Sequence, residues 1–153
     1  MGYDKRLDRA TRYTSQSPAT FDGSYWLYTE APERPPSSAS GKWLVFVYLA
    51  DVDRWWGTIS RAARAGRLGP SAKVATAVPS PLSTNPRVRL ICVYTSDWHD
   101  KDDVRRVLRG LRELGISWGL SYKTDEATLD GRYGSGVSIY VSQQGDDFDD
   151  RST

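Results

Sequence analysis

The sequence is poor in the residues that build metal centres and covalent cross-links. It contains one cysteine and one histidine, so a disulfide within the chain is excluded and no His/Cys metal-binding spacing can form. Glycine-rich phosphate loops and the nucleophile elbow of serine hydrolases are also missing from the sequence. We therefore expect no metal ion and no cofactor, and any function must rest on other side chains.

Long hydrophobic runs are absent as well. No apolar stretch approaches the ~18 residues that span a bilayer, and the N-terminal residues lack the apolar region of a signal peptide. The lone Cys92 lies in the apolar run from Val88 to Val93, where a cysteine is usually a small core residue. An unpaired thiol fits a reducing compartment. We expect a cytoplasmic protein without a membrane partner.

Neither sign of charge dominates. The formal net charge is +2, so no global field marks a nucleic-acid binder. The segment 145–150 reads Gly-Asp-Asp-Phe-Asp-Asp, which predicts a disordered acidic tail over residues 143–153; a phosphate mimic that occupies the protein's own basic site is the alternative. Residues 1–23 are mostly polar and predict a flexible arm. Residues 24–142 then form a single domain.

Hydrophobic periodicity predicts the elements of that domain. Apolar stripes at helical spacing predict helices over 52–66 and 100–114. The polar, glycine-containing segment 124–135 predicts a loop. Because several predicted strands follow one another without a helix between them, we predict an α+β domain whose mainly antiparallel sheet carries both helices on one face. The predicted strands cover residues 25–29, 43–49, 71–78, 87–95, 116–122 and 137–142.

Cations at strand ends are the candidate functional residues. Lys73 lies inside an otherwise apolar strand beside small alanines, so its ammonium must reach solvent, pair with an acid or face a ligand. Because neighbouring strands lie ~4.8 Å apart, cations on adjacent strands can converge, as the binding of a phosphate requires. Ordinary surface positions are the alternative for these cations. The candidate phosphate ligands are Lys42, Arg87, Arg89, Lys123 and Arg132.

Four stretches resemble the basophilic leukaemia-expressed protein family, in the family's order. They begin at Gly41 (Gly-Lys-Trp-Leu-Val-Phe-Val), Ala65 (Ala-Gly-Arg-Leu-Gly-Pro-Ser-Ala-Lys-Val-Ala-Thr), Ile91 (Ile-Cys-Val-Tyr-Thr-Ser-Asp-Trp) and Leu120 (Leu-Ser-Tyr-Lys-Thr-Asp). That family resembles translation initiation factor 4E, which implies a curved sheet of the same fold. The loop before Gly41 lacks the Trp-Glu pair with which the factor reads a methylated guanine.

Lys42 and the segment Lys73-Val-Ala-Thr are also similar to the phosphothreonine lyases of bacterial effectors and of some lanthipeptide synthetases. This resemblance implies that Lys73 takes the α-proton, that Lys42 stabilises the developing charge, and that Arg89 holds phosphate. Leu44 stands where those enzymes carry a general-acid histidine. Tyr94 is the candidate to replace it, with Lys123 as the other.

The resemblances together predict a phosphothreonine-lyase-like protein. It would bind a phosphorylated ligand in a cationic site, with elimination of phosphate from phospho-Thr or phospho-Ser peptides as the associated chemistry. A non-catalytic module that binds a nucleotide or an RNA end is the first alternative, and an interaction module without a small ligand is the second. The expected partner is a phosphorylated peptide or a nucleotide, and nucleic acid stays open as a partner.

Overall fold

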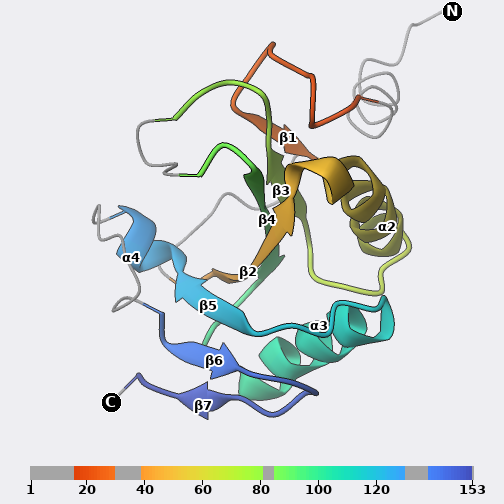
Figure 1. The fold of residues 1–153 in the computed structure, drawn as a ribbon. Helices are drawn as coiled ribbons and strands as arrows, with labels where there is room; N and C mark the ends of the chain where they lie inside the picture. The colour runs from red at the N-terminus through yellow and green to blue at the C-terminus, as the bar shows by residue number, and fades with distance from the viewer. Residues whose placement is uncertain (1–15, 30–38, 81–84, 130–137, 153) are drawn as a thin grey trace, which may run out of the picture.

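The structure is a computed structural model that describes residues 16–29, 39–80, 85–129 and 138–152. Within these ranges seven strands form one sheet in the order β1-β3-β4-β2-β5-β6-β7, and every pairing is antiparallel (Figure 1). The predicted α+β class is confirmed. The strands are β1 Trp26–Tyr28, β2 Gly41–Tyr48, β3 Ala72–Ala75, β4 Val88–Thr95, β5 Leu120–Thr124, β6 Tyr140–Ser142 and β7 Asp149–Asp150.

Two long helices cover one face of this sheet. They are α2 (Val52–Arg64) and α3 (Lys101–Glu113), close to the predicted spans, and a short 3-10 helix, η1 (Leu49–Asp51), leads into α2. The apolar stripes of both helices enter the same core, so the prediction that they share one face holds (Figure 1). The stripes comprise Val52, Trp56, Ile59 and Ala62 of α2, and Val104, Val107, Leu108 and Leu111 of α3.

The central strand β2 shows how the two faces of the sheet differ. Its side chains alternate, because successive residues of a strand point to opposite faces. Trp43, Val45 and Val47 are buried beneath the helices, whereas Phe46 and Tyr48 are exposed on the other face. A buried sheet face opposite an open one is the usual arrangement for an antiparallel sheet. We call this second face the open face, and Phe46 and Tyr48 are the residues of β2 at which a ligand can reach it.

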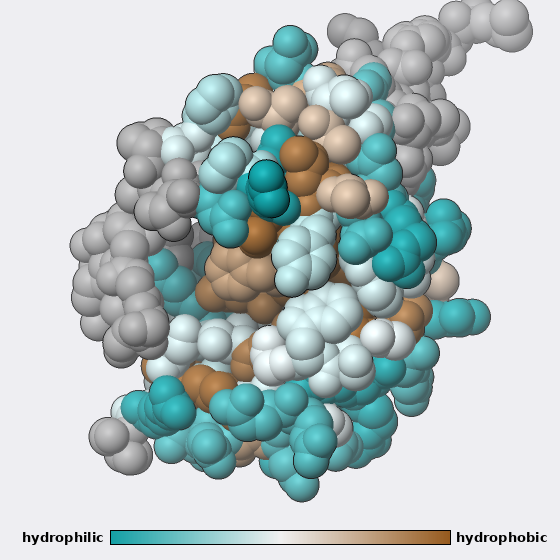
Figure 2. Space-filling model, in the orientation of Figure 1, coloured by the Kyte–Doolittle hydropathy of each residue, from teal (hydrophilic) through white to brown (hydrophobic). Residues whose placement is uncertain are grey.

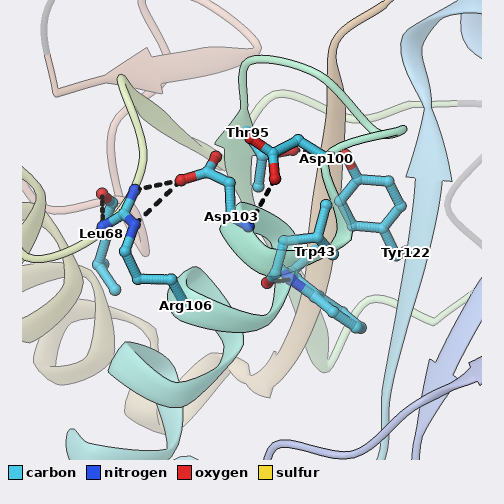
Figure 3. Close-up of polar contacts among 8 residues, drawn as sticks. Trp43, Leu68, Thr95, Asp100, Asp103, Arg106 and Tyr122 are labelled. Carbon is cyan, nitrogen blue, oxygen red and sulfur yellow. Dashed lines mark hydrogen bonds and ion pairs between the residues drawn. The ribbon is translucent and has the colours of Figure 1, made fainter.

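Polar contacts anchor the start of α3 against the sheet (Figure 3). The Asp100 carboxylate accepts from the Asp103 amide at 3.2 Å, so Asp100 is the cap of this helix. The Trp43 indole donates to the carbonyl of Val104 at 3.1 Å. The bond from Trp43 ties β2 to α3.

The first residue of β2, Gly41, is a glycine because no side chain fits at this position. A Cβ at this position would lie 2.2 Å from the Tyr122 hydroxyl, far inside van der Waals contact. That hydroxyl in turn bonds to Thr95 at 2.5 Å (Figure 3). The close approach of β2, β4 and β5 at this end of the sheet therefore requires glycine.

One segment differs from the predicted element. Residues after β5 were predicted as a polar loop, but Asp125–Leu129 form a short helix, α4. The Thr124 hydroxyl accepts from the Ala127 amide at 3.1 Å and so starts it. In Figure 1, α4 lies away from α2 and α3, on the other side of β5. It brings Asp125 to the open face.

The acidic C-terminal segment is not the predicted disordered tail. Residues 149–150 form β7 on the edge of the sheet, and the Phe148 ring packs 4.8 Å from that of Tyr140. Asp146 receives two hydrogen bonds from Arg109, at 2.7 and 2.9 Å. The segment is ordered because α3 presents arginines to it, and these lie more than 30 residues away in the sequence.

Part of the predicted N-terminal arm is ordered too. Residues 1–15 lie outside the described ranges, but Ser17 and Ala19 donate to the Asp53 carboxylate of α2 at 2.7 and 3.1 Å. Phe21 packs against the core. An acceptor at the start of α2 thus holds residues 16–23 to the domain. No helix of the described ranges is long and apolar enough to cross a membrane.

Candidate functional site: a lysine face on the open side of the sheet

Strand register gathers three lysines and one tyrosine on the open face. Lys42 lies opposite Tyr94 of β4 and opposite Lys123 of β5. Lys73 of β3 lies opposite Cys92, which is two residues from Tyr94 and so points to the same face. We call Lys42, Lys73, Tyr94 and Lys123 the lysine face. Four of the predicted site residues therefore do converge.

Lys42 is neutralised by a carboxylate that sequence reasoning did not assign. Its ammonium nitrogen lies 2.8 Å from Asp125 Oδ1, and both side chains are buried. Ser40 donates to the other carboxylate oxygen at 2.5 Å, and the Asp125 amide donates to the carbonyl of Ser40 at 2.8 Å. The signal in the sequence was an acid two residues after Lys123, at the end of a strand. Its partner was visible only once β2 and β5 were paired.

Lys73 is stabilised by aromatic rings in place of an acid. Its ammonium lies 4.0 Å from the centre of the Trp26 ring and 5.7 Å from that of Tyr94, both within the range of cation–π attraction. Among the described residues it makes no hydrogen bond or ion pair. Burial lowers the pKa of Lys73, the nearby Lys42 ammonium lowers it further, and Cys92 and Asp125 oppose the shift.

Tyr94 lies between the two ammonium groups. Lys42 is 5.7 Å from the centre of its ring, the same distance as Lys73. Burial raises the pKa of Tyr94 well above its usual value, so the phenol stays protonated and can donate a hydrogen bond. Burial also raises the pKa of Cys92 to about 11. That cysteine is therefore a thiol at neutral pH and a poor nucleophile.

Arg87 and Arg89 do not join the lysine face. Arg89 lies opposite Val47, a core residue, so its side chain points to the face that the helices cover. Its guanidinium donates to the carbonyl of Pro86 at 3.1 Å. Arg87 precedes β4 and is exposed. Arg132 lies outside the described residues. The assignment of Arg89 as a phosphate ligand beside Lys73 is corrected accordingly.

The charge balance of the lysine face favours an anion. Asp125 pairs with Lys42, whereas Lys73 has no acidic partner among the described residues. Lys42 and Lys123 are 5 % and 7 % exposed, and they lie directly opposite each other, where like charges repel. A phosphate beside Lys73 would supply the negative charge that this ammonium lacks among the described residues.

Apolar side chains continue the open face beyond the lysines. Leu44, Phe46 and Tyr48 follow Lys42 along β2, and the last two are 53 % and 69 % exposed. In Figure 2, brown and pale side chains gather over the middle of the molecule, where Figure 1 places β2, with teal side chains around them. The open face therefore has a cationic end and an apolar end.

Fold and site together define an α+β protein with one helix-covered sheet face and one open face that carries buried lysines. A comparison with protein families identifies it further. The family of basophilic leukemia-expressed protein Bles03 matches residues 34–128, which is more than half of the chain. The chain belongs to this family. The match includes β2, β3, β4 and β5, and thus every residue of the lysine face.

Proposed function

We propose that the lysine face binds a phosphorylated ligand, within a fold of the initiation factor 4E type. The observation that carries the proposal is Lys73, a half-buried ammonium that has aromatic neighbours and no acidic partner among the described residues. A protein stabilises such a group poorly by itself, because burial disfavours the charged form. A phosphate oxygen would supply the missing negative charge, and Lys42 and Lys123 would supply further donors.

The same groups support phosphothreonine-lyase-like chemistry. Lys73 in its neutral form takes the proton from the α-carbon of a phospho-Thr or phospho-Ser residue. The electron pair of that C–H bond forms the double bond between Cα and Cβ, while the Cβ–O bond breaks and phosphate leaves with its electrons. The lowered pKa of Lys73 favours the neutral amine that this step requires.

The remaining groups assist the departing phosphate. Lys42 and Lys123 stabilise the charge that develops on the enolate and the phosphate. A proton on the leaving oxygen completes the phosphate, and Tyr94 and Lys123 are the donors of this face. Because the pKa of Tyr94 is raised, it is a weak acid, and its contribution is a hydrogen bond. Elimination without a histidine at Leu44 is therefore slow.

Calorimetry tests the binding step. A phosphothreonine peptide, its unphosphorylated form and inorganic phosphate are titrated into the wild-type protein and into Lys73→Ala. We expect the wild-type protein to bind the phosphorylated peptide much more tightly than the unphosphorylated one. Lys73→Ala should bind the phosphorylated peptide about 10- to 100-fold more weakly than wild type does. Arg89→Ala and Glu113→Gln are the controls, because neither side chain lies on the open face. If wild type and Lys73→Ala bind every phosphorylated ligand with equal affinity, the proposal that the lysine face binds phosphate is wrong.

Mass spectrometry tests the chemical step. The phosphopeptide is incubated with the protein in the presence of a chelator. Elimination leaves a dehydrated residue, whereas hydrolysis leaves the hydroxyl, so the two products differ by the mass of one water. The absence of any dehydrated product at high protein concentration would leave a binding protein without lyase activity.

One observation favours a second function, the binding of a nucleotide or an RNA end. Trp26 lies beside Lys73 on the open face, and an aromatic ring next to a cation is a common way to hold a base next to its phosphate. Nucleoside monophosphates titrated in the same series distinguish the two. A preference for the nucleotide that Trp26→Leu abolishes would favour this second function.

A further inference from the structure

The lysine face and the apolar end of the open face lie on the same strands in continuous register. Leu44 lies opposite Cys92, Phe46 opposite Leu90, and Tyr48 opposite Val88. We call Leu44, Phe46, Tyr48 and Leu90 the apolar strip. It begins one step along β2 from Lys42, because Lys42 and Leu44 are successive side chains on the open face.

The strip is exposed where a sheet usually covers such residues. Phe46 and Tyr48 are the exposed large hydrophobic residues of the described chain, and they are neighbours on one face of one strand. Single exposed apolar residues need no explanation, but adjacent aromatic ones mark a contact surface. Aromatic side chains are also the residues that supply most of the energy in such contacts.

The distribution of charge along the open face limits the kinds of ligand that can bind there. Lys42 and Lys123 precede the strip, and Lys73 lies beside its first register pair, opposite Cys92. The three register pairs themselves contain no charged side chain. A single-stranded nucleic acid repeats its phosphate at every nucleotide and is bound through cations along its whole path. A ligand with one phosphate and an apolar extension fits the distribution better, and a phosphopeptide has this chemistry.

The spacing sets where the apolar residue of that peptide lies. Phe46 is four residues from Lys42, which corresponds to ~13 Å along a strand at ~3.3 Å per residue. An extended peptide has nearly the same rise per residue. On the basis of the proposed function, we infer that the ligand is a phosphopeptide with a large apolar side chain about four residues from the phosphorylated residue, and that the apolar strip binds this side chain.

A leucine scan tests the inference. Fluorescein-labelled phosphothreonine peptides with an alanine and serine background carry a single Leu at each position from five before to five after the phosphothreonine. Fluorescence anisotropy gives the affinity of each peptide relative to the peptide without Leu. We expect the affinity to increase about 3- to 10-fold when Leu lies about three to five residues from the phosphothreonine on one side of it. The reason is that part of the Leu side chain becomes buried.

Two substitutions of Phe46 assign that increase to the strip. Phe46→Ser is expected to abolish the difference between the Leu peptide and the reference, and Phe46→Leu to retain most of it, because the second variant keeps an apolar contact. Glu113→Gln at the end of α3 serves as the surface control. If Phe46→Ser keeps the full preference for Leu, the strip is not the docking surface and the inference is overturned.

The outcomes separate this inference from the proposed function. A flat leucine scan with binding that still depends on Lys73 overturns the inference and leaves phosphate binding in place. Loss of all phosphopeptide binding overturns both. A 5′-phosphorylated RNA of six nucleotides is the third ligand. If it binds tighter than every peptide and loses affinity in Phe46→Ser, the strip serves nucleic acid and the phosphopeptide inference is overturned.

Discussion

The ammonium of Lys42 lies 2.8 Å from a carboxylate oxygen of Asp125, and both side chains are buried. The pair joins β2 to the start of α4, across 83 residues of sequence. A buried ion pair is costly to break, because the partner that remains keeps a charge without compensation. It also places an internal anion on the face where we propose that an external one binds. Asp125 therefore supports the fold, and it would compete with the ligand that we propose.

Replacing Asp125 should separate these two effects. We expect Asp125→Ala to lower the free energy of unfolding by about 3 kcal/mol, as measured by urea denaturation. The affinity for a phosphopeptide should rise in the same variant, because the carboxylate of Asp125 then no longer competes for Lys42. The double variant Lys42→Met with Asp125→Leu should recover much of the lost stability, since an apolar pair replaces the ions. A drop in both stability and affinity would contradict competition.

Lys73 should reduce the stability of the folded protein. Its folded-state pKa lies below the unfolded value, so between these two values the unfolded chain binds more protons than the native one. Stability therefore rises with pH across this window and carries the full cost of burial below it. We expect Lys73→Met to be more stable than wild type near pH 7, by about 1 kcal/mol, and to show a flatter dependence on alkaline pH.

Urea denaturation followed by tryptophan fluorescence at several pH values between 7 and 10 measures this effect. Arg61→Met is the control for loss of a cation, since Arg61 is an exposed residue of α2. If Lys73→Met is less stable than wild type and keeps the same pH dependence, the contact with Trp26 outweighs the cost of burial.

The C-terminal segment should detach when its contacts to α3 are weakened. Asp146 bonds to Arg109, Asp150 to Lys101, and the Arg151 amide donates to the carbonyl of Ile139 at 2.6 Å. We expect Asp146→Asn, or about 1 M salt, to accelerate hydrogen exchange of the Arg151 amide, because exposed ion pairs are screened. The exposed Asp147 makes no such contact in the described structure, so Asp147→Asn should leave the rate unchanged.

The same segment also has an apolar anchor and an acid-sensitive contact. Phe148→Ala should lower the free energy of unfolding by about 2 kcal/mol, below the range for fully buried phenylalanine. Hydrogen bonds from Lys101 and then Ser152 lower the pKa of Asp150 to about 2. Its stabilising contribution is therefore complete above its unfolded pKa of ~3.9 and is lost as the pH falls toward 2. If the hydrogen-exchange rate of the Arg151 amide stays the same under all of these changes, other contacts hold the segment.

Leu44 offers a test of the chemistry. It lies on the open face, opposite Cys92 and Ser121, and our proposal equates it with the general-acid histidine of the phosphothreonine lyases. We expect Leu44→His to increase the rate of phosphate elimination by about 10- to 100-fold, because a general acid would then protonate the leaving oxygen. Leu44→Gln controls for polarity at this position, and circular dichroism checks that both variants fold. Equal rates for His and Gln would argue against lyase chemistry at this site.

Local patterns in the sequence were sufficient for the two long helices and for most strands. The stripes of α2 and α3 recur at helical spacing, so they indicate a buried face without knowledge of its partner. The strand that contains Lys73 was predicted too long, because the apolar run 71–78 extends past the residues that pair with β1 and β4. The face of Lys73 followed from alternation, since Ala72 and Val74 on either side of it are buried.

The location of Arg89 was decided by tertiary structure. In the run from Val88 to Val93 the residues on both faces of the strand are mostly apolar. Alternation of apolar and polar residues therefore does not indicate which face is buried. The helices determine which face is buried. Ile91 and Val93 pack beneath them, and Arg89, two residues before Ile91, points to the same face. Sequence reasoning therefore found the right strand and placed this cation on the wrong side of it.

The sequence by itself determined the class of fold, the two amphipathic helices and the candidate lysines, because these depend on spacing within a few residues. Only the tertiary structure decided which charges meet. Asp125 joins Lys42, Trp26 lies against Lys73, and the arginines of α3 hold the acidic C-terminal segment. Each of these contacts joins residues from separate elements, and its existence depends on strand order and register, which no local pattern encodes.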